Sequence, residues 1–96
     1  MTVWFVSRHP GAIAWAQKKN LSVDHWVTHL DVSKIKKGDW VIGVLPVAMA
    51  AAVCAKSARF FTLKMNLREE LRGRELTADE MSKLNCSLQE YFVQPT

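Results

Sequence analysis

A hydroxyl, a guanidinium and an imidazole follow one another at Ser7, Arg8 and His9, directly after a short apolar segment. Pro10 and Gly11 come next and open a segment rich in helix-forming residues. Backbone N–H groups at a helix N-terminus favour anions, and an arginine can bind a phosphate through two parallel hydrogen bonds. Glycine lets a ligand approach the backbone closely. This pattern predicts an anion site formed by Ser7, Arg8 and His9, in which Arg8 would grip a phosphate and Gly11 would let the ligand approach the backbone.

Each of these polar residues also has an ordinary structural interpretation. Ser7 would cap the following helix, Arg8 would pair with a carboxylate, and His9 would lie in solvent. Three polar residues crowded at the end of a buried strand are harder to explain in this way. We therefore favour the site.

Two further segments are candidates for the rest of such a site. The turn formed by Gly43, Val44, Leu45 and Pro46 has no polar side chain. It would offer backbone groups and shape to a ligand, although close packing of the turn explains its composition equally well. Elsewhere, Arg72 and Arg74 lie on either side of a glycine. Two guanidiniums suit a phosphate or a stacked base, and a solvated, salt-bridged loop is an equal alternative.

The sequence offers little support for a metal or cofactor site. His25 and His29 are four residues apart, but no H-E-x-x-H pattern or nearby cysteine pair accompanies them. Cys54 and Cys86 are far apart in the chain, which favours a reducing, cytoplasmic environment. The glycine-rich dinucleotide motif and the Walker motif are both missing from the sequence. We expect no metal and no cofactor.

Length and composition define the setting for these residues. The chain has 96 residues, 49% of them hydrophobic, and a formal net charge of +4. We expect a single domain over residues 1–96, too small for a multi-step enzyme and stabilised by association with a second copy. The apolar stretch 40–55 contains a glycine and a proline and is shorter than the ~20 residues that span a bilayer. Three lysines within residues 34–37 form a solvated turn, too short for a nucleic-acid-binding tail.

Strand-like and helix-like segments alternate along the chain. Periodicity and composition predict strands at 2–7, 23–30, 40–45, 59–65 and 90–93. They predict three helices. The first covers 10–19 and stops at Asn20, the second follows Pro46, and the third covers 77–86, where Thr77 and Glu80 form a capping box. This order predicts a small Rossmann-like α/β domain with a mostly parallel sheet and flanking helices. Ligands bind beyond the carboxyl ends of the strands of such sheets, where Ser7 to Gly11 and Gly43 to Pro46 would lie.

Several segments together resemble a known family, the small CRISPR-associated accessory proteins encoded beside type III systems. Members of that family belong with the CRISPR-associated Rossmann-fold proteins and act as ring nucleases. The matching segments are residues 5–12 (FVSRHPGA), 29–31 (HLD), 38–39 (GD), 41–46 (VIGVLP) and 70–76 (ELRGREL). The resemblance implies binding and cleavage of cyclic oligoadenylate, with cyclic tetra-adenylate the expected ligand, which would switch off an antiviral signal.

The resemblance also implies roles for the candidate residues. Ser7, Arg8 and His9 would be the reacting region, and Gly43, Leu45 and Pro46 would line the neighbouring wall. Arg72 and Arg74 would clasp the ring. The family pattern leads us to expect a hydroxyl residue at position 44, where this chain has Val44.

The physical chemistry of the ligand fits these implied roles. A cyclic tetranucleotide has two-fold symmetry, so a homodimer would present the same turn to opposite phosphates. The ribose 2′-OH can attack the adjacent phosphate once the two are held in line, which makes a metal unnecessary.

Two other classes of function come from the same residues. A histidine phosphatase also has an Arg-His pair after its first strand, but it needs further residues from a much longer chain. A non-catalytic module that sequesters the nucleotide would use the same basic pocket. Analysis of the products distinguishes sequestration from cleavage.

Overall fold

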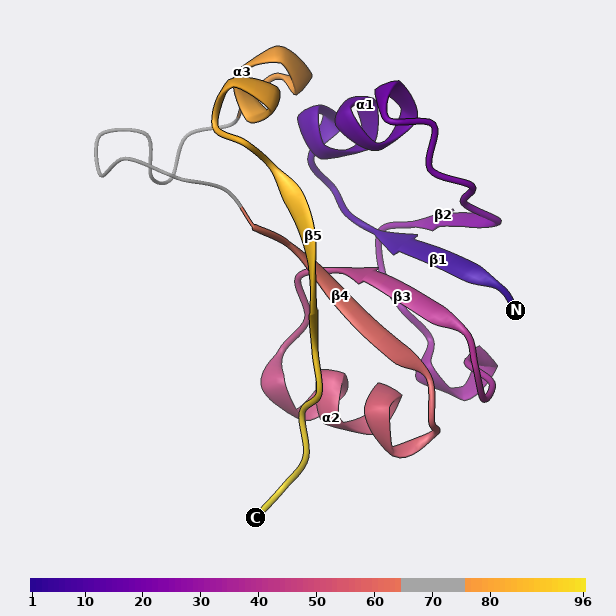
Figure 1. Cartoon of the computed structure of the whole chain (residues 1–96). Coiled ribbons are helices and arrows are strands. Elements are labelled where there is room, and N and C mark those ends of the chain that lie inside the picture. The colour runs from indigo at the N-terminus through magenta and orange to yellow at the C-terminus, as the bar shows by residue number, and fades with distance from the viewer. Residues whose placement is uncertain (65–75) are drawn as a thin grey trace.

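The computed structural model describes residues 1–64 and 76–96, which form a three-layered α/β domain (Figure 1). Its elements, in chain order, are β1 (Val3–Val6), α1 (Pro10–Lys18), β2 (His25–Val27), the 3-10 turn η1 (Val32–Lys34), β3 (Trp40–Gly43), α2 (Val47–Ala55), β4 (Arg59–Lys64), α3 (Ala78–Lys83) and β5 (Ser87–Tyr91). The sheet order is β2-β1-β3-β4-β5. Strands β1 to β4 pair in parallel, and β5 is antiparallel to β4. The predicted mostly parallel sheet with flanking helices is confirmed.

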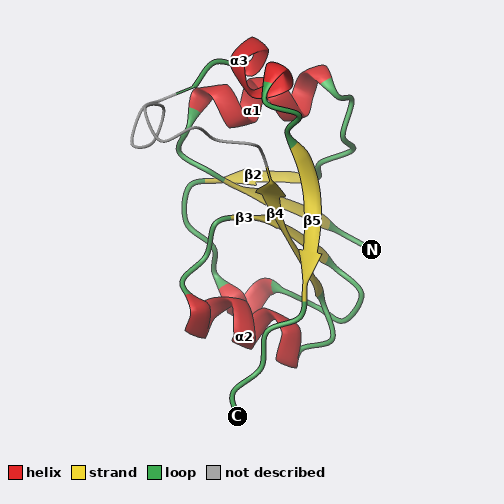
Figure 2. Cartoon of the chain, turned by 60° about the vertical axis from the view of Figure 1, so that its left-hand side comes forward, coloured by secondary structure: helices red, strands yellow, loops and turns green. Residues whose placement is uncertain are grey.

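Helices cover both faces of the sheet. Figure 2 shows α1 and α3 on one face and α2 on the other. Successive side chains of a strand point to opposite faces, so a strand covered on both faces must be apolar throughout. In β1, Val3 and Phe5 pack with α1 and α3, whereas Trp4 and Val6 pack with α2. This explains why all four residues of β1 are buried.

Some element boundaries differ from those predicted. Strand β2 has three residues, not the eight of 23–30, because it lies at the edge of the sheet and pairs with β1 alone. The helix predicted at 77–86 has its capping box at Thr77 and Glu80 but ends at Lys83, because the chain turns into a left-handed conformation at Asn85. Strand β5 follows soon after this turn and begins at Ser87 rather than at Glu90. A left-handed Asn20 follows the end of α1, as predicted.

A buried aspartate organises the end of the sheet where the parallel strands begin. Asp39 is 5% exposed and accepts hydrogen bonds from the backbone N–H groups of Thr2 (3.1 Å) and Lys36 (3.0 Å) and from Trp4 Nε1 (3.4 Å). Burial alone would raise the pKa of this carboxyl, but the hydrogen bonds outweigh burial and lower the pKa. Asp39 therefore joins the start of β1 to the turn that precedes β3.

The two cysteines are both free and both buried. Cys86 belongs to the core on the α1 and α3 face, and Cys54 belongs to the core on the α2 face. Burial raises the pKa of the Cys86 thiol to about 11, so this thiol stays protonated and unreactive. Within the described ranges, 1–64 and 76–96, no helix is long and apolar enough to cross a membrane.

Candidate active site

The strand order creates a crevice between β1 and β3. From β1 the chain passes through α1 to β2 on one side, and from β3 it passes through α2 to β4 on the other side. Because α1 and α2 cover opposite faces, the loops that leave β1 and β3 diverge at their carboxyl ends (Figure 1). In open α/β sheets this switch point is where ligands bind.

A pocket of about 630 Å³ lies at this switch point. The loop after β1 contributes Ser7, Arg8 and His9 to its lining, so the pocket contains the three polar residues that the sequence singles out. The last residue of β3 and the loop after it contribute all four residues from 43 to 46. Apolar side chains supply further walls, among them Leu30, Met49, Leu63, Leu76 and Met81. The pocket volume lies within the range of small-molecule sites, roughly 300–1,000 Å³.

Ser7 holds the loop after β1 in shape. Its backbone N–H donates to the carbonyl oxygen of Val27 at 3.0 Å, which fixes the loop beside the end of β2. Its Oγ accepts the backbone N–H of His9 at 3.0 Å. His9 is the N-cap residue of α1, and the hydrogen bond to Ser7 Oγ fixes its backbone. The Ser7 hydroxyl keeps its own hydrogen, which can donate to a ligand oxygen.

Arg8 and His9 present their side chains at the pocket surface. Both residues are exposed, whereas Ser7 is half-buried. Arg8 Nη2 lies 3.4 Å from His29 Nε2, so the guanidinium extends toward the segment that follows β2. The carbonyl oxygen of His9 accepts the N–H groups of Ala12 and Ile13, which starts the first turn of α1. A permanent cation and two imidazoles thus share the pocket.

His29 is a lining residue that sequence reasoning did not assign to this site. In the sequence, His29 is paired only with His25, and this pair lacks the further ligands of a metal-site motif. The signal that identifies it is topological: His29 follows β2, which is parallel to β1, so both strands end at the same edge of the sheet. His25 lies at the other end of β2, where its ring stacks on Trp4 with 4.3 Å between ring centroids. Among residues 1–64 and 76–96, no three His, Cys, Asp or Glu residues form a group that could hold a metal ion.

Gly43 lets β1 and β3 approach each other at the base of the pocket. Its φ of +155° is one that residues with a side chain rarely adopt, and a Cβ here would collide with the carbonyl oxygen of Val6. The glycine therefore allows close packing of β1 and β3, which is one of the two roles expected for this turn. Gly43, Leu45 and Pro46 nevertheless line the pocket as well.

Gly11 has a different setting from the one expected. It is not among the lining residues, and a Cβ at this position would collide with the carbonyl oxygen of Leu76, in the segment before α3. The glycine thus makes room for the protein's own backbone. The other predicted ligand contacts, Arg72 and Arg74, lie outside the described residues.

The arrangement suits a ligand that carries both phosphate and flat apolar groups. The N-cap residues of α1 and α2, His9 and Pro46, line the pocket, and neither makes a side-chain cap hydrogen bond. Helix N-termini attract anions, and Arg8 adds a permanent positive charge. The apolar walls would accept a ring such as a nucleobase. Phosphate binding would therefore concentrate on the side of Ser7, Arg8 and His9.

Fold and pocket together define a small α/β protein of Rossmann-like topology with its candidate site at the switch point. Residues 4–94 match the family model described as "Putative CRISPR-associated protein (Cas_VVA1548)", and the chain belongs to that family. No curated protein and no solved structure matches the chain.

Proposed function

We propose that this protein is a ring nuclease of type III CRISPR defence. It binds cyclic oligoadenylate, with cyclic tetra-adenylate the expected substrate, and cleaves it to linear products, which switches off the antiviral signal. The observation that carries this proposal is the placement of Ser7, Arg8 and His9 in one pocket at the switch point of the sheet, in a chain of a CRISPR-associated family. The two free thiols support action in the reducing cytoplasm.

The proposed reaction uses a nucleophile that the substrate supplies. The 2′-oxygen of one ribose attacks the adjacent phosphorus, the bond from phosphorus to the 5′-oxygen breaks, and the product ends in a 2′,3′-cyclic phosphate. The protein's task is to hold the 2′-oxygen, the phosphorus and the 5′-oxygen in line and to neutralise charge on the phosphorane. Arg8 is the cation placed to do so, and the Ser7 hydroxyl and the start of α1 orient a non-bridging oxygen. His9 is a general acid or base.

The walls of the pocket would bind the rest of the ligand. Gly43, Leu45 and Pro46 face it from the β3 side, where they would contact a base or sugar. Val44 supplies no side-chain hydrogen bond, so this wall would recognise the ligand by shape and backbone groups. Arg72 and Arg74 are proposed to clasp the ring, and a homodimer would place two such pockets around one two-fold symmetric ligand.

Incubation with cyclic tri-, tetra- and hexa-adenylate, followed by chromatography and mass spectrometry of the products, tests the proposal. Linear oligoadenylates ending in 2′,3′-cyclic phosphate are expected from the tetra-adenylate. The matched control is Arg8→Ala, which removes the cation but leaves the buried fold untouched. Tight binding with unchanged rings after long incubation would instead identify a sequestering module. Neither binding nor cleavage of any ring would refute the proposal.

A further inference from the structure

His29 faces the same pocket as Arg8 and His9 but comes from a different element. It lies just after β2, and the parallel pairing of β2 with β1 brings the ends of both strands together. The backbone bond from Ser7 N–H to the Val27 carbonyl oxygen, at 3.0 Å, fixes the two loops side by side. His29 is exposed, so a bound ligand can reach its ring. The imidazole is therefore a component of the pocket wall that can contact a ligand directly.

The contact with Arg8 favours one tautomer of this imidazole. Arg8 Nη2 and His29 Nε2 are 3.4 Å apart. A guanidinium has donors and no acceptor, so a hydrogen bond between these two atoms requires Nε2 to accept, as it does in the tautomer that carries its proton on Nδ1. An unprotonated imidazole nitrogen thus lies beside the cation that would bind the scissile phosphate. This is the state and the position that a general base requires.

We propose that His29 is the general base of the cleavage reaction and that His9 is the general acid; this inference rests on the proposed function. When Arg8 turns to the phosphate, Nε2 of His29 becomes available to the ribose 2′-OH. The 2′-hydroxyl proton passes to Nε2 as the bond between the 2′-oxygen and phosphorus forms. The bond from phosphorus to the 5′-oxygen breaks, and the departing oxygen takes a proton from the His9 imidazolium. Both imidazoles exchange these protons with water before the next cycle.

The groups around His29 are compatible with this assignment. The permanently charged Arg8, from the loop after β1, contacts His29, and the same pocket is lined by His9 from that loop and by apolar residues that follow β3. In its own segment, Asp31 is engaged with the N–H and the hydroxyl of Ser33, at 3.1 and 2.6 Å. Within residues 1–64 and 76–96, the other imidazole that lines the pocket is that of His9. Two imidazoles of opposite task give a bell-shaped dependence of cleavage rate on pH.

The test compares His29→Gln and His29→Ala with the wild-type protein in single-turnover cleavage of cyclic tetra-adenylate from pH 5 to pH 9. Glutamine can still accept a hydrogen bond from Arg8 through Oε1 but cannot take up a proton. Both variants should bind the ring within a few-fold of wild type, which also shows that they fold, and both should cleave it ~10²-fold or more slowly. The fall in rate on the acid side of the wild-type profile should disappear. His25→Gln, which removes an imidazole from the other end of β2, is the matched control and should cleave at the wild-type rate.

A substrate with sulfur in place of the 5′-oxygen separates the base from the acid. A thiolate leaves without needing a proton, so His9→Ala should recover most of its rate on this substrate, while His29→Ala stays slow. Cleavage of the normal ring by His29→Gln at the wild-type rate would overturn the inference, because His29 would then only position Arg8. Recovery of His29→Ala on the sulfur substrate would overturn it too. A wild-type protein that cleaves no ring would instead refute the proposed function itself.

Discussion

Arg8 and His9 are neighbours in one loop, yet the proposed reaction requires different things of them. Arg8 carries a permanent charge that meets the phosphate in the ground state and in the transition state alike. Arg8→Ala should therefore weaken binding and slow cleavage together. His9 transfers a proton in the transition state, so His9→Ala should leave affinity within a few-fold and cut single-turnover cleavage by ~10²-fold or more. Dissociation constants and single-turnover rates of both variants from pH 5 to pH 9 provide the comparison.

Arg8→Lys is the informative control for the first variant, because lysine retains the charge but loses the bidentate geometry. Partial recovery of affinity is expected. If His9→Ala cleaves at the wild-type rate at every pH, the imidazole has no chemical role. Catalysis would then rest on Ser7, Arg8 and alignment of the backbone.

The nucleophile in the proposed reaction belongs to the substrate, so cleavage should not depend on a divalent metal ion. Alignment of the 2′-OH and charge neutralisation by Arg8 supply what a metal would otherwise provide. Cleavage of cyclic tetra-adenylate should proceed in EDTA at the rate seen without chelator. Loss of activity in EDTA, followed by recovery when Mg²⁺ or Mn²⁺ is added, would contradict this expectation.

Asp39 should make the folded state sensitive to acid. Its pKa in the folded state lies below the ordinary value of 3.8. The ionised carboxylate therefore stabilises the fold at pH values above about 3.8, and this contribution is lost as the pH falls through the lower, folded-state pKa. In Asp39→Asn the NH₂ group of the amide would face backbone and indole N–H groups that now donate hydrogen bonds to the carboxylate. This clash of donors should lower the free energy of unfolding by about 1–3 kcal/mol at pH 7. Urea unfolding at pH 7 and at pH 3 should show the variant less stable at pH 7 and the difference smaller at pH 3. An equal loss at both pH values would assign the effect to packing.

At the scale of elements, Gly11 determines how closely α1 can approach the segment before α3. Glycine inside a helix usually costs roughly 0.5–1 kcal/mol relative to alanine, so helix propensity predicts that Gly11→Ala stabilises the protein. The added Cβ would collide with the Leu76 carbonyl, which is backbone and cannot rotate away. We expect this collision to win, with a net loss of about 1–3 kcal/mol, as in other overpacked sites. Urea unfolding measures the sign directly, and a gain in stability would show that α3 moves aside.

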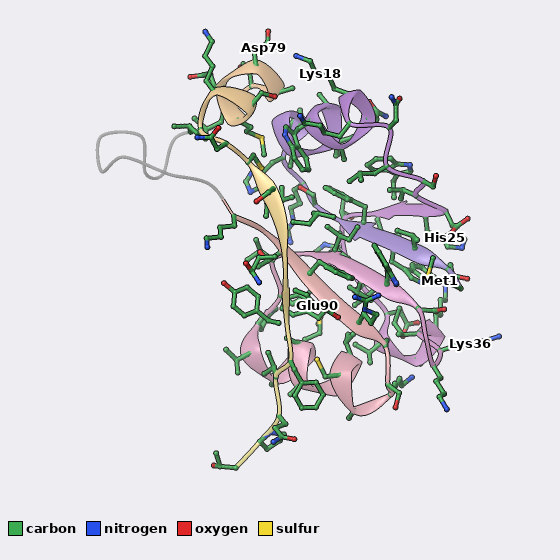
Figure 3. All side chains as sticks on the ribbon, in the orientation of Figure 1. Met1, Lys18, His25, Lys36, Asp79 and Glu90 are labelled. Atoms are coloured by element: carbon green, nitrogen blue, oxygen red, sulfur yellow. The ribbon has the colours of Figure 1, made fainter. Side chains whose placement is uncertain are left out.

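The ion pair between the same two helices is expected to matter much less. Lys18 Nζ and Asp79 Oδ1 are 2.7 Å apart, and Figure 3 shows both side chains on the outer side of α1 and α3. Both groups are more than half exposed, and exposed ion pairs contribute little to stability because water and salt screen them. Lys18→Ala is therefore a suitable control for Gly11→Ala, because it alters the same helix pair without a backbone collision.

The sequence predicts elements well where both sides of a segment are buried. Residues 40–43 and 47–55 read as a strand and a helix, because a central strand is apolar throughout and a helix against it has small residues. Prediction fails at the edges. Strand β2 has two exposed residues out of three, and β5 has none that are buried, so neither has a hydrophobic pattern that defines its ends.

Separation along the sequence explains which residues of the candidate site could be predicted. Ser7, Arg8 and His9 are consecutive, so their shared location could be predicted from one strand end. His29 is 21 residues from Arg8, and its contact with the guanidinium depends on the strand order β2-β1-β3. The setting of Gly11 depends in the same way on Leu76, which is distant in the sequence and lies where a Cβ on Gly11 would be. Residues that a local pattern places together are predictable, whereas pairings that depend on topology are not.

At the scale of the whole molecule, we predict a homodimer whose interface borders the pocket. A domain of 96 residues buries a modest share of its surface, and a cyclic tetranucleotide is two-fold symmetric and larger than one pocket accommodates. Val44 and Val47, beside the pocket in the loop after β3 and at the start of α2, are 82% and 77% exposed. Exposed apolar side chains next to a site are the kind that an interface covers.

Light scattering of the wild-type protein, with and without cyclic tetra-adenylate, should give the mass of two chains. Val44→Asp and Val47→Asp should shift the mass toward one chain, because charges in an apolar interface are poorly tolerated. Val47 is not among the lining residues, so slower ring cleavage by Val47→Asp would report loss of the dimer. Phe92→Asp is the matched control: Phe92 is also apolar and 72% exposed, but it follows β5 at the opposite edge of the sheet from β2. A monomer in both conditions would contradict the homodimer. If Phe92→Asp dissociates the dimer and the valine variants do not, the interface lies along β5 and each pocket must bind its share of the ring without direct help from its partner.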